Sequence, residues 1–328
     1  MKNPTVFMSL ALMSLFGPAS AAGPFDARWN EGAERCPTFV AGMTESRAYD
    51  ETTIVLRQNP CVNFEAPFVY LLIGGARALL VDSGASDDPE ASNDLYEAVE
   101  RHLRRPDGTK LPLTVVHTHG HLDHRAGDAM FGSKPFVTVV PSAGEPMHRG
   151  LGITAWPDGM GAIDLGDRTI DVIPAPGHHE NHVVFYDRRT QLLLTGDFLL
   201  PGRLLVDDID AYEASARRVA DFAASHPVSQ VFGAHIELDA TGDLYTFGAT
   251  VHPNERALAL TVQDVQGLPA ALAAFNGFYS PHPNYVVVNP IRNLIVLACG
   301  VIAAFVLLVW IARRLWKRRR ARRLANSS

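Results

Sequence analysis

Apolar residues recur in short runs along the chain after residue 52, and the first three runs have the length of strands. They read TTIVL, PFVYLLI and ALLVD. Breaks that contain glycine, Gly74-Gly75 and Ser83-Gly84, follow the second and the third run. Because glycine at such breaks favours tight turns, we predict paired strands in this part of the chain.

The hydrophobic period changes over residues 89–105. Leu95, Val99 and Leu103 are spaced four apart there, which predicts a helix. A second long helix is predicted over 210–224. Strand-like runs lie between and after these helices: LTVVHTH, PFVTVV, RTIDVIPAPGH, HVVFY, QLLLTGD and VSQVFGAH, with DHRAGDAMF as a short helix. Strands and helices alternate without regular βαβ units, so we predict two sheets packed between helices in a domain spanning 52–278.

The residues before this domain fall into two parts. Residues 1–22 begin with Lys2, continue with an apolar stretch and end at Ala19-Ser20-Ala21. This is the layout of a secretory signal peptide, and its apolar stretch is too short for a membrane anchor. Residues 23–51 lack a clear period, and we expect this extension to wrap around the domain.

The residues after the domain indicate a membrane anchor. Residues 279–292 contain several prolines and are expected to be a linker. Residues 293–312 carry no charge and, as a helix, would span about 30 Å, the thickness of a hydrocarbon core. The next stretch, RRLWKRRRARR, has eight basic residues and no acidic one, which argues against a buried soluble helix.

The basic stretch also predicts the topology. Basic flanks stay on the cytoplasmic side, so residues 293–312 would cross the inner membrane once, with residues 313–328 as a cytoplasmic tail. The domain would then lie on the periplasmic side. A removable C-terminal sorting signal of similar layout stays open as an alternative.

Charge excludes one class of partner. The chain has 29 basic and 35 acidic residues, and Lys2 together with the eight basic residues of the tail lies outside the domain. The exported part is therefore strongly acidic, whereas nucleic-acid binding needs a basic face. We expect no nucleic acid, a small-molecule substrate, and lipid contacts made by the C-terminal helix and the basic tail.

The chain has three cysteines. Cys36 and Cys61 lie in the exported part, where disulfides persist, and we predict that they pair, with free thiols as the alternative. Cys299 lies in the apolar stretch and is expected to be a packing residue. No C-x-x-C spacing of a zinc ribbon is present.

The stretch VVHTHGHLDH gathers candidate metal ligands. Histidine nitrogen is a preferred ligand of zinc and related metals. One H-x-H frame begins at His117 and one at His119, and only the second uses every polar residue of the loop. We therefore interpret His117 as a packed residue of the preceding strand. The predicted ligands of this loop are His119, His121, Asp123 and His124.

One loop cannot close a metal site, so later ligands are needed. Three apolar strands end in the polar clusters APGHHENH, LLLTGD and VFGAH. Strand ends are places where binding and catalytic groups gather. The later candidates are His178, His179, His182, Asp197 and His235.

These motifs together resemble those of the metallo-β-lactamase superfamily. HGHLDH matches the HxHxDH signature of that family, and APGHH, LLTGD and FGAH follow in the family's order. LLIGGARALLVDSGAS is similar to its early strands. The resemblance covers about residues 52–238. It implies an α/β fold, the αβ/βα four-layer sandwich, with metals at one edge.

The resemblance also implies two metal sites. The first ion would be held by His119, His121 and His178, the second by Asp123, His124 and His235, with Asp197 bridging both. The family's ligand directly follows the Pro-Gly turn, which selects His178. The implied cofactors are two Zn²⁺ ions, with Fe or Mn possible. Asp123 would also take a catalytic role by accepting a proton or orienting the attacking hydroxide.

Three further residues are assigned from the resemblance. His182 matches a second histidine of the glyoxalase II-like members and is expected to support the site by a hydrogen bond. Asp82 is likewise expected to have a structural role or to contact a ligand without binding the metal itself. His179 stands where the family more often has a small hydroxyl residue, a departure that changes the surroundings of the ligands.

The implied activity is hydrolysis by a hydroxide shared between two ions. The bridging Asp197 resembles glyoxalase II, lactonases and related esterases, so we expect hydrolysis of an ester, lactone or thioester. The helical C-terminal domain of glyoxalase II and its basic glutathione-binding residues are not evident. Three alternatives stay open: a mononuclear iron persulfide dioxygenase, a β-lactamase, and an inactive binding module or scaffold.

Overall fold

The computed structural model describes residues 25, 27–37, 42–105 and 107–325 of the 328-residue chain. The predicted signal peptide, residues 1–22, lies outside these described residues.

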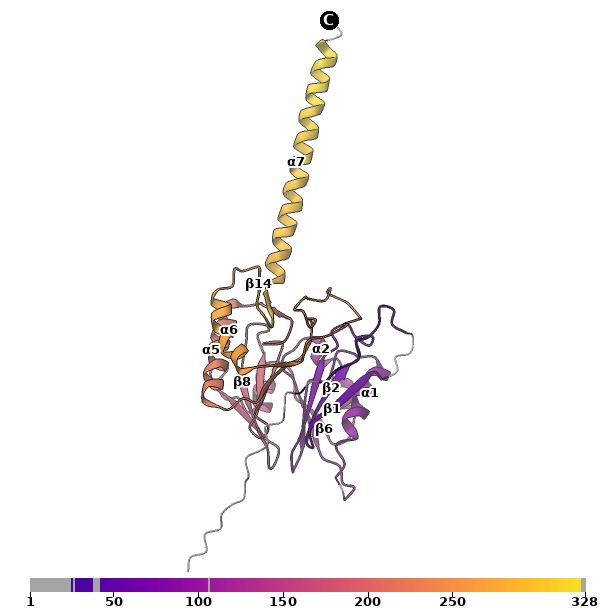
Figure 1. The fold of residues 1–328 in the computed structure, drawn as a ribbon, viewed down its shortest axis with the longest axis vertical. Coiled ribbons are helices and arrows are strands. Elements are labelled where there is room, and N and C mark those ends of the chain that lie inside the picture. Colours follow the sequence, from indigo (N-terminus) through magenta and orange to yellow (C-terminus); the bar gives the residue numbers. More distant parts are fainter. Residues whose placement is uncertain (1–24, 26, 38–41, 106, 326–328) are drawn as a thin grey trace, which may run out of the picture.

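Two six-stranded sheets form the centre of the domain (Figure 1). The first has the order β1-β2-β3-β4-β5-β6, and the second has the order β13-β12-β10-β9-β8-β7. The strands of the first sheet are β1 (Thr44–Asp50), β2 (Thr53–Gln58), β3 (Phe68–Ile73), β4 (Ala78–Val81), β5 (Leu113–Val116) and β6 (Val137–Val139). Those of the second are β7 (Gly161–Asp164), β8 (Thr169–Pro174), β9 (Val183–Asp187), β10 (Leu192–Gly196), β12 (Gln230–Gly233) and β13 (Ala259–Leu260).

The two sheets pack face to face, and helices cover their outer faces. Val55 and Leu79 of the first sheet share one buried cluster with Phe185 and Leu194 of the second. Helix α1 (Pro89–Glu100) packs on the outside of the first sheet, whereas α5 (Ile209–Ser225) and α6 (Val262–Ala273) pack on the outside of the second. Short helices lie in connections: α2 (Leu122–Arg125), α3 (Asp128–Gly132) and α4 (Gly144–Gly150). This confirms the predicted αβ/βα four-layer sandwich.

The end of the N-terminal extension forms a strand that the sequence pattern did not predict. Its last residues form β1, which pairs antiparallel with β2, with Thr44 opposite Gln58. The strand reads TESRAYD, and none of its side chains is fully buried because it lies at the edge of the sheet. An edge strand that exposes both charged and apolar residues has no strict alternation, and the sequence pattern therefore missed it.

The predicted linker, 279–292, is also part of the fold. It forms β14 (Tyr279–Pro281) and β15 (Val286–Val288), and β15 pairs in parallel with β11 (Arg203–Leu205). Val286 and Val287 are buried. The prediction of a linker was wrong because this short valine run finds a partner strand about 80 residues earlier in the chain, a pairing that no local pattern indicates.

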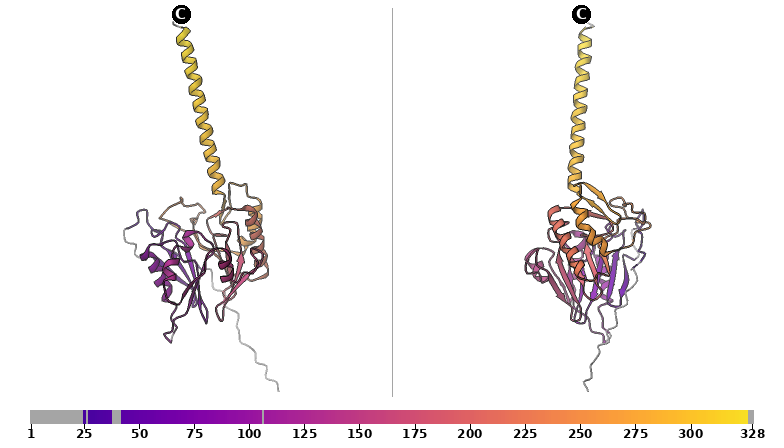
Figure 2. Two further views of the ribbon diagram at one scale, coloured as in Figure 1. Left: turned by 180° about the vertical axis from the view of Figure 1, so that it is seen from behind. Right: turned by 60° about the vertical axis from the view of Figure 1, so that its left-hand side comes forward.

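Helix α7 (Pro290–Ala325) leaves the domain as one continuous rod (Figures 1 and 2). It begins three residues before the predicted span of 293–312. Its segment Pro290–Lys317 is long and apolar enough to cross a membrane, and none of its most apolar window is buried against the domain. The chain thus has one candidate membrane helix at this end.

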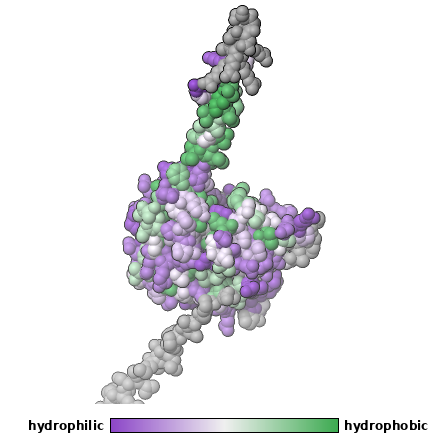
Figure 3. Space-filling model, turned by 45° about the horizontal axis from the view of Figure 1, so that its top comes forward, coloured by the Kyte–Doolittle hydropathy of each residue, from purple (hydrophilic) through white to green (hydrophobic). Residues whose placement is uncertain are grey.

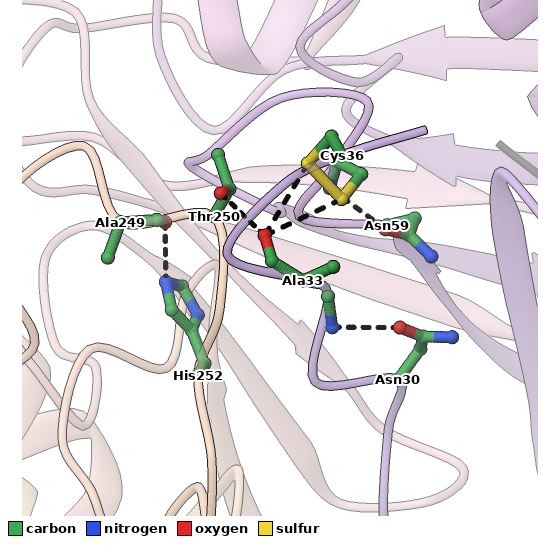
Figure 4. Close-up of a disulfide and its surroundings, with 9 residues drawn as sticks. Asn30, Ala33, Cys36, Asn59, Ala249, Thr250 and His252 are labelled. Atoms are coloured by element: carbon green, nitrogen blue, oxygen red, sulfur yellow. Dashed lines mark hydrogen bonds between the residues drawn. A yellow bond between two sulfur atoms is a disulfide. The ribbon is translucent and has the colours of Figure 1, made fainter. Parts of the chain in front are cut away.

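A disulfide between Cys36 and Cys61, the predicted pair, joins the extension to the loop that follows β2. Its Cα atoms are 5.3 Å apart. Close by, the Ala33 carbonyl accepts a hydrogen bond from Thr250 Oγ1 at 2.8 Å, and the Ala33 amide donates to the Thr250 carbonyl at 2.9 Å (Figure 4). The extension therefore ties the loop after β2 to the loop around residue 250.

Candidate metal centre

The predicted ligands follow the ends of strands from both sheets. His119 comes after β5, His178 after β8, Asp197 directly after β10, and His235 after β12. All four strands end on the same side of the sandwich. Helix α2, which belongs to the HGHLDH loop, lies at the end of the domain from which α7 departs (Figure 1).

Two glycines allow the chain to turn tightly beside the ligands. Gly177 has a φ of +144°, and a Cβ there would come within 2.3 Å of the Tyr212 backbone. Gly196 has a φ of +53°, and a Cβ there would lie 2.7 Å from Thr118. Only glycine fits both positions without displacing a neighbour. These turns place His178 and Asp197 over the open edge of the second sheet.

Three histidine nitrogens converge in the first group. Nε2 of His119 lies 2.8 Å from Nδ1 of His121, and Nε2 of His178 lies 3.2 Å from the same atom. Nitrogens that share one tetrahedral zinc at roughly 2.0–2.1 Å lie about 3.3 Å apart. The spacing of these three nitrogens therefore fits a single metal ion.

The second group combines two carboxylates with two histidines. Oδ2 of Asp123 lies 3.0 Å from Nε2 of His124 and 3.3 Å from Nε2 of His235. Oδ1 of Asp197 lies 3.5 Å and 3.3 Å from the same two nitrogens. One ligand atom from each residue lies within 4.8 Å of the others. Such a mixed nitrogen and oxygen set suits zinc and other divalent metals.

Asp197 connects the two groups. Its Oδ1 faces the second group, whereas its Oδ2 lies 3.5 Å from Nε2 of His178 in the first. The two oxygens of one carboxylate thus point to different groups. This is the arrangement that a bridging carboxylate requires.

Hydrogen bonds on the far side fix three of the rings. Nδ1 of His124 donates to Asp82 at 2.8 Å, Nδ1 of His178 to the Leu205 carbonyl at 3.1 Å, and Nδ1 of His235 to the Glu65 carbonyl at 2.7 Å. Each Nε2 then faces the neighbouring aspartates, the orientation in which it can bind a metal once deprotonated. Nε2 of His124 and His235 is buried without a hydrogen-bond partner among the described residues. These buried acceptors fit a metal.

The charges favour deprotonated carboxylates. Burial raises the pKa of Asp123 and Asp197, but the neighbouring His124 and His235 more than offset this, so that both pKa values are lowered. Burial lowers the pKa of His124 and His235, yet the two aspartates outweigh it and raise both. Burial, together with the nearby histidines, lowers the pKa of His119 and His178. Both shifts favour the neutral ring, the form that binds metal.

The other histidines of the motifs take different places. His117 lies outside both groups, and its Nε2 is 2.8 Å from Asp128. His179 is half-buried and accepts the Asn181 amide hydrogen at 3.1 Å. His182 is fully buried and stacks on His119, with ring centres 5.0 Å apart. Neither nitrogen of His182 has a hydrogen-bond partner among the described residues, so its predicted hydrogen bond to the site is not formed there.

Five of the seven predicted ligands line a pocket of about 440 Å³: His121, Asp123, His178, Asp197 and His235. The motifs did not predict the other walls of this pocket. These walls carry no motif because they come from several separate loops and short strands, Arg203 and Leu205 from β11 among them. Burial raises the pKa of Glu65, one of them, against the opposing effect of His235. The unpredicted lining residues include Glu65, Leu200, Arg203, Leu205, Phe247 and Val288.

The fold and this site define a class of protein: an αβ/βα sandwich with two adjoining histidine and carboxylate groups at one end. The sequence profile of the metallo-β-lactamase superfamily matches residues 62–235, more than half of the chain, and the protein belongs to that superfamily.

Relatives of known sequence agree with this membership. A hydroxyacylglutathione hydrolase from Methylococcus capsulatus is 30% identical over 211 residues, which cover 62% of this chain and 74% of that protein. An acyl-coenzyme A thioesterase from Gallus gallus is 25% identical over 213 residues, with 54% and 75% covered. Among solved structures, a metallo-β-lactamase from Pontibacter korlensis is 15% identical with a TM-score of 0.44, covering 71% of this chain and 100% of that one.

Proposed function

We propose that the protein is an exported, membrane-anchored hydrolase of an ester, lactone or thioester that uses two divalent metal ions, in the first instance zinc. The observation that carries the proposal is the pair of ligand groups joined by the two oxygens of Asp197. The similarity to a hydroxyacylglutathione hydrolase and to an acyl-coenzyme A thioesterase supports acyl groups as substrates.

The residues of the site have different roles in the proposed hydrolysis. Two ions held there would lower the pKa of water and stabilise the negative charge that develops on the substrate oxygen. Asp123 belongs to the second group and also lines the pocket, so its carboxylate can accept a proton from the attacking water. Asp82 and the carbonyls of Leu205 and Glu65 hold the histidine rings in one orientation.

The location rests on separate features. The apolar stretch of α7 is the anchor, and the basic residues that follow this stretch lie on the cytoplasmic side. The domain then lies outside the cytoplasm, where the Cys36–Cys61 disulfide would persist.

Metal analysis and turnover test the proposal together. The full chain, purified in detergent and loaded with zinc, should hold about two zinc ions and hydrolyse short esters, thioesters or lactones. His121→Ala should lower kcat/KM more than the roughly 10–100-fold that loss of an outer partner of a ligand costs.

His226→Ala is the matched control, because His226 is an exposed histidine that stacks on Phe222 of α5, away from the ligands. Turnover that His121→Ala leaves unchanged would overturn the proposed site. One iron per chain with oxygen consumption would point instead to the dioxygenase.

A further inference from the structure

The metal pocket and the candidate membrane helix share a wall. Val288, the last residue of β15, and Pro290, the first residue of α7, line the same pocket as the metal ligands. Leu205 lies opposite Val288 in the pairing of β11 with β15 and lines the pocket as well. The base of the anchor is therefore built into the site.

The position of the charges along α7 places this wall at the membrane surface. Arg292 is the last charged residue before the apolar stretch that begins at Asn293. Pro290 precedes Asn293 by three residues, about 5 Å at helical rise. Each headgroup layer of a bilayer is roughly 5–8 Å thick. The Pro290 wall of the pocket therefore lies in the headgroup layer, beside the depth at which acyl linkages of membrane amphiphiles lie.

The pocket itself suits an apolar chain. Leu200, Leu205 and Phe247 supply apolar walls, and a volume of about 440 Å³ is in the range of small-molecule sites. Among the described residues that line the pocket, Arg203 is the only lysine or arginine. Its guanidinium already pairs with Glu237 at 2.9 Å. A polyanionic carrier such as coenzyme A would find no free cationic side chain in this pocket.

Apolar side chains are exposed at the same end of the domain. Leu122 lies between the predicted ligands His121 and Asp123 and is 66% exposed. Phe247, which lines the pocket, is 71% exposed. Phe278 and Tyr279, beside the base of α7, are exposed too. Figure 3 views this end and shows hydrophobic surface among polar surface next to α7. Tyrosine, here Tyr279, is one of the residues enriched at membrane interfaces.

A second hollow lies on the other side of Asp123. It has a volume of about 530 Å³ and shares Glu65 and Asp123 with the first pocket. Its own lining includes Asn63, Asp87 and Arg125, so it is more polar in character. A molecule with an acyl chain in the first pocket and a polar head in the second would place the bond between them at Asp123.

We infer that the substrate is a long-chain acyl ester or thioester that resides in the membrane entered by α7 and reaches the metal centre past Pro290. The inference rests on the proposed hydrolase function and names its substrate class. In the reaction a bond forms between the water oxygen and the acyl carbon. The bond from that carbon to the leaving oxygen or sulfur breaks, the leaving group takes one proton, and a fatty acid is released.

Chain length tests the apolar pocket. The zinc-loaded full chain in phosphatidylcholine vesicles is given N-acetylcysteamine thioesters of butyrate and palmitate. Because each buried methylene favours binding by several-fold, kcat/KM should be at least roughly 30-fold higher for palmitate. Phe247→Glu should lower the ratio of palmitate to butyrate by about 10-fold or more.

Phe136→Glu is the matched control, since Phe136 is 68% exposed and precedes β6 at the opposite end of the sandwich. It should leave the ratio unchanged. A wild-type ratio near one, or the same fall in both variants, would overturn the inference while butyrate turnover still upholds the proposed function. No turnover of either thioester by zinc-loaded protein would overturn both.

Membrane residence is tested by placing the substrate. A thioester analogue of phosphatidylcholine, whose hydrolysis releases a free thiol, is included either in the vesicles that hold the protein or in separate vesicles. Turnover should be at least roughly 10-fold faster when protein and analogue share a vesicle. Equal rates in both arrangements would show access from water and overturn the inference.

Discussion

Oδ2 of Asp82 lies 2.8 Å from Nδ1 of His124, and both side chains are buried. Asp82 comes directly after β4 with a φ of +69°, a strained backbone for a residue other than glycine. It also accepts the Thr118 amide hydrogen at 2.8 Å. The strain is compensated by these bonds, which lock the ring of His124 with Nε2 toward Asp123 and Asp197.

Asp82→Asn should weaken metal binding at the second group. An amide cannot anchor the imidazole N–H as a carboxylate does, and loss of such partners typically costs 10–100-fold in metal affinity. Competition against a zinc chelator measures the affinity. Asp171→Asn is the control, because Asp171, on β8, pairs with Arg188 at a distance from the ligands. Equal affinities in Asp82→Asn and the wild type would contradict the role of Asp82.

Asp197→Asn should remove the bridge between the two groups. Asparagine has one side-chain oxygen, so residue 197 could then offer an oxygen ligand to only one of the two groups. The negative charge that the Asp197 carboxylate shares between the two ions would be lost. We expect zinc content to fall from about two to about one per chain and kcat to fall by more than about 100-fold, beyond the effect of an outer partner. Elemental analysis after dialysis and the thioester assay measure both. Retention of two tightly bound zinc ions would refute bridging.

Arg168→Ala should destabilise the whole sandwich. The Arg168 guanidinium is buried in a turn of the second sheet and pairs with Asp187 at 2.6 Å. It also donates to the carbonyl of Thr52, in the turn before β2, at 2.8 Å. A further hydrogen bond goes to Oγ1 of Thr53, the first residue of β2 in the first sheet, at 2.6 Å. Removing one partner leaves Asp187, which has no exposed surface, as an uncompensated charge.

The expected cost of Arg168→Ala is about 3–5 kcal/mol in the free energy of unfolding, measured with urea on the full chain in detergent. Arg217→Ala serves as the comparison because the side chains of Arg217 and its partner Glu213 are 56% and 27% exposed. Its loss should cost no more than about 1 kcal/mol. Similar costs for the two variants would show that burial of the Arg168 pair does not matter.

Local patterns predicted the elements that carry their own signal. The helix expected over 210–224 is α5, Ile209–Ser225, and the strands that end at His178, Asp197 and His235 lie where their apolar runs indicated. The HGHLDH loop is recognisable because its ligands are neighbours in the sequence.

Long-range features were beyond such patterns. β15 is defined by its pairing with β11, and Val288 and Pro290 become pocket walls only through that pairing. Glu65 orients His235 through its backbone carbonyl. Because every residue has such a carbonyl, no residue type in the sequence indicates this contact. The stacking of His182 on His119 likewise depends on how two loops meet.

The disulfide should stabilise both the fold and the second ligand group. Cys36 and Cys61 are separated by 25 residues, and closing a loop of that size typically stabilises by about 3 kcal/mol. Cys61 also begins the loop whose Glu65 carbonyl orients His235. Reduction should therefore lower the urea midpoint of the full chain in detergent and weaken zinc binding.

The double variant Cys36→Ser/Cys61→Ser should behave in the same way without reductant, and reductant should then have no further effect on it. Cys299→Ser is the control, because Cys299 is a free thiol on α7 that takes no part in the domain. A double variant with the urea midpoint and the zinc affinity of the wild type would show that the extension and the Glu65 loop are held by their hydrogen bonds alone, such as those between Ala33 and Thr250.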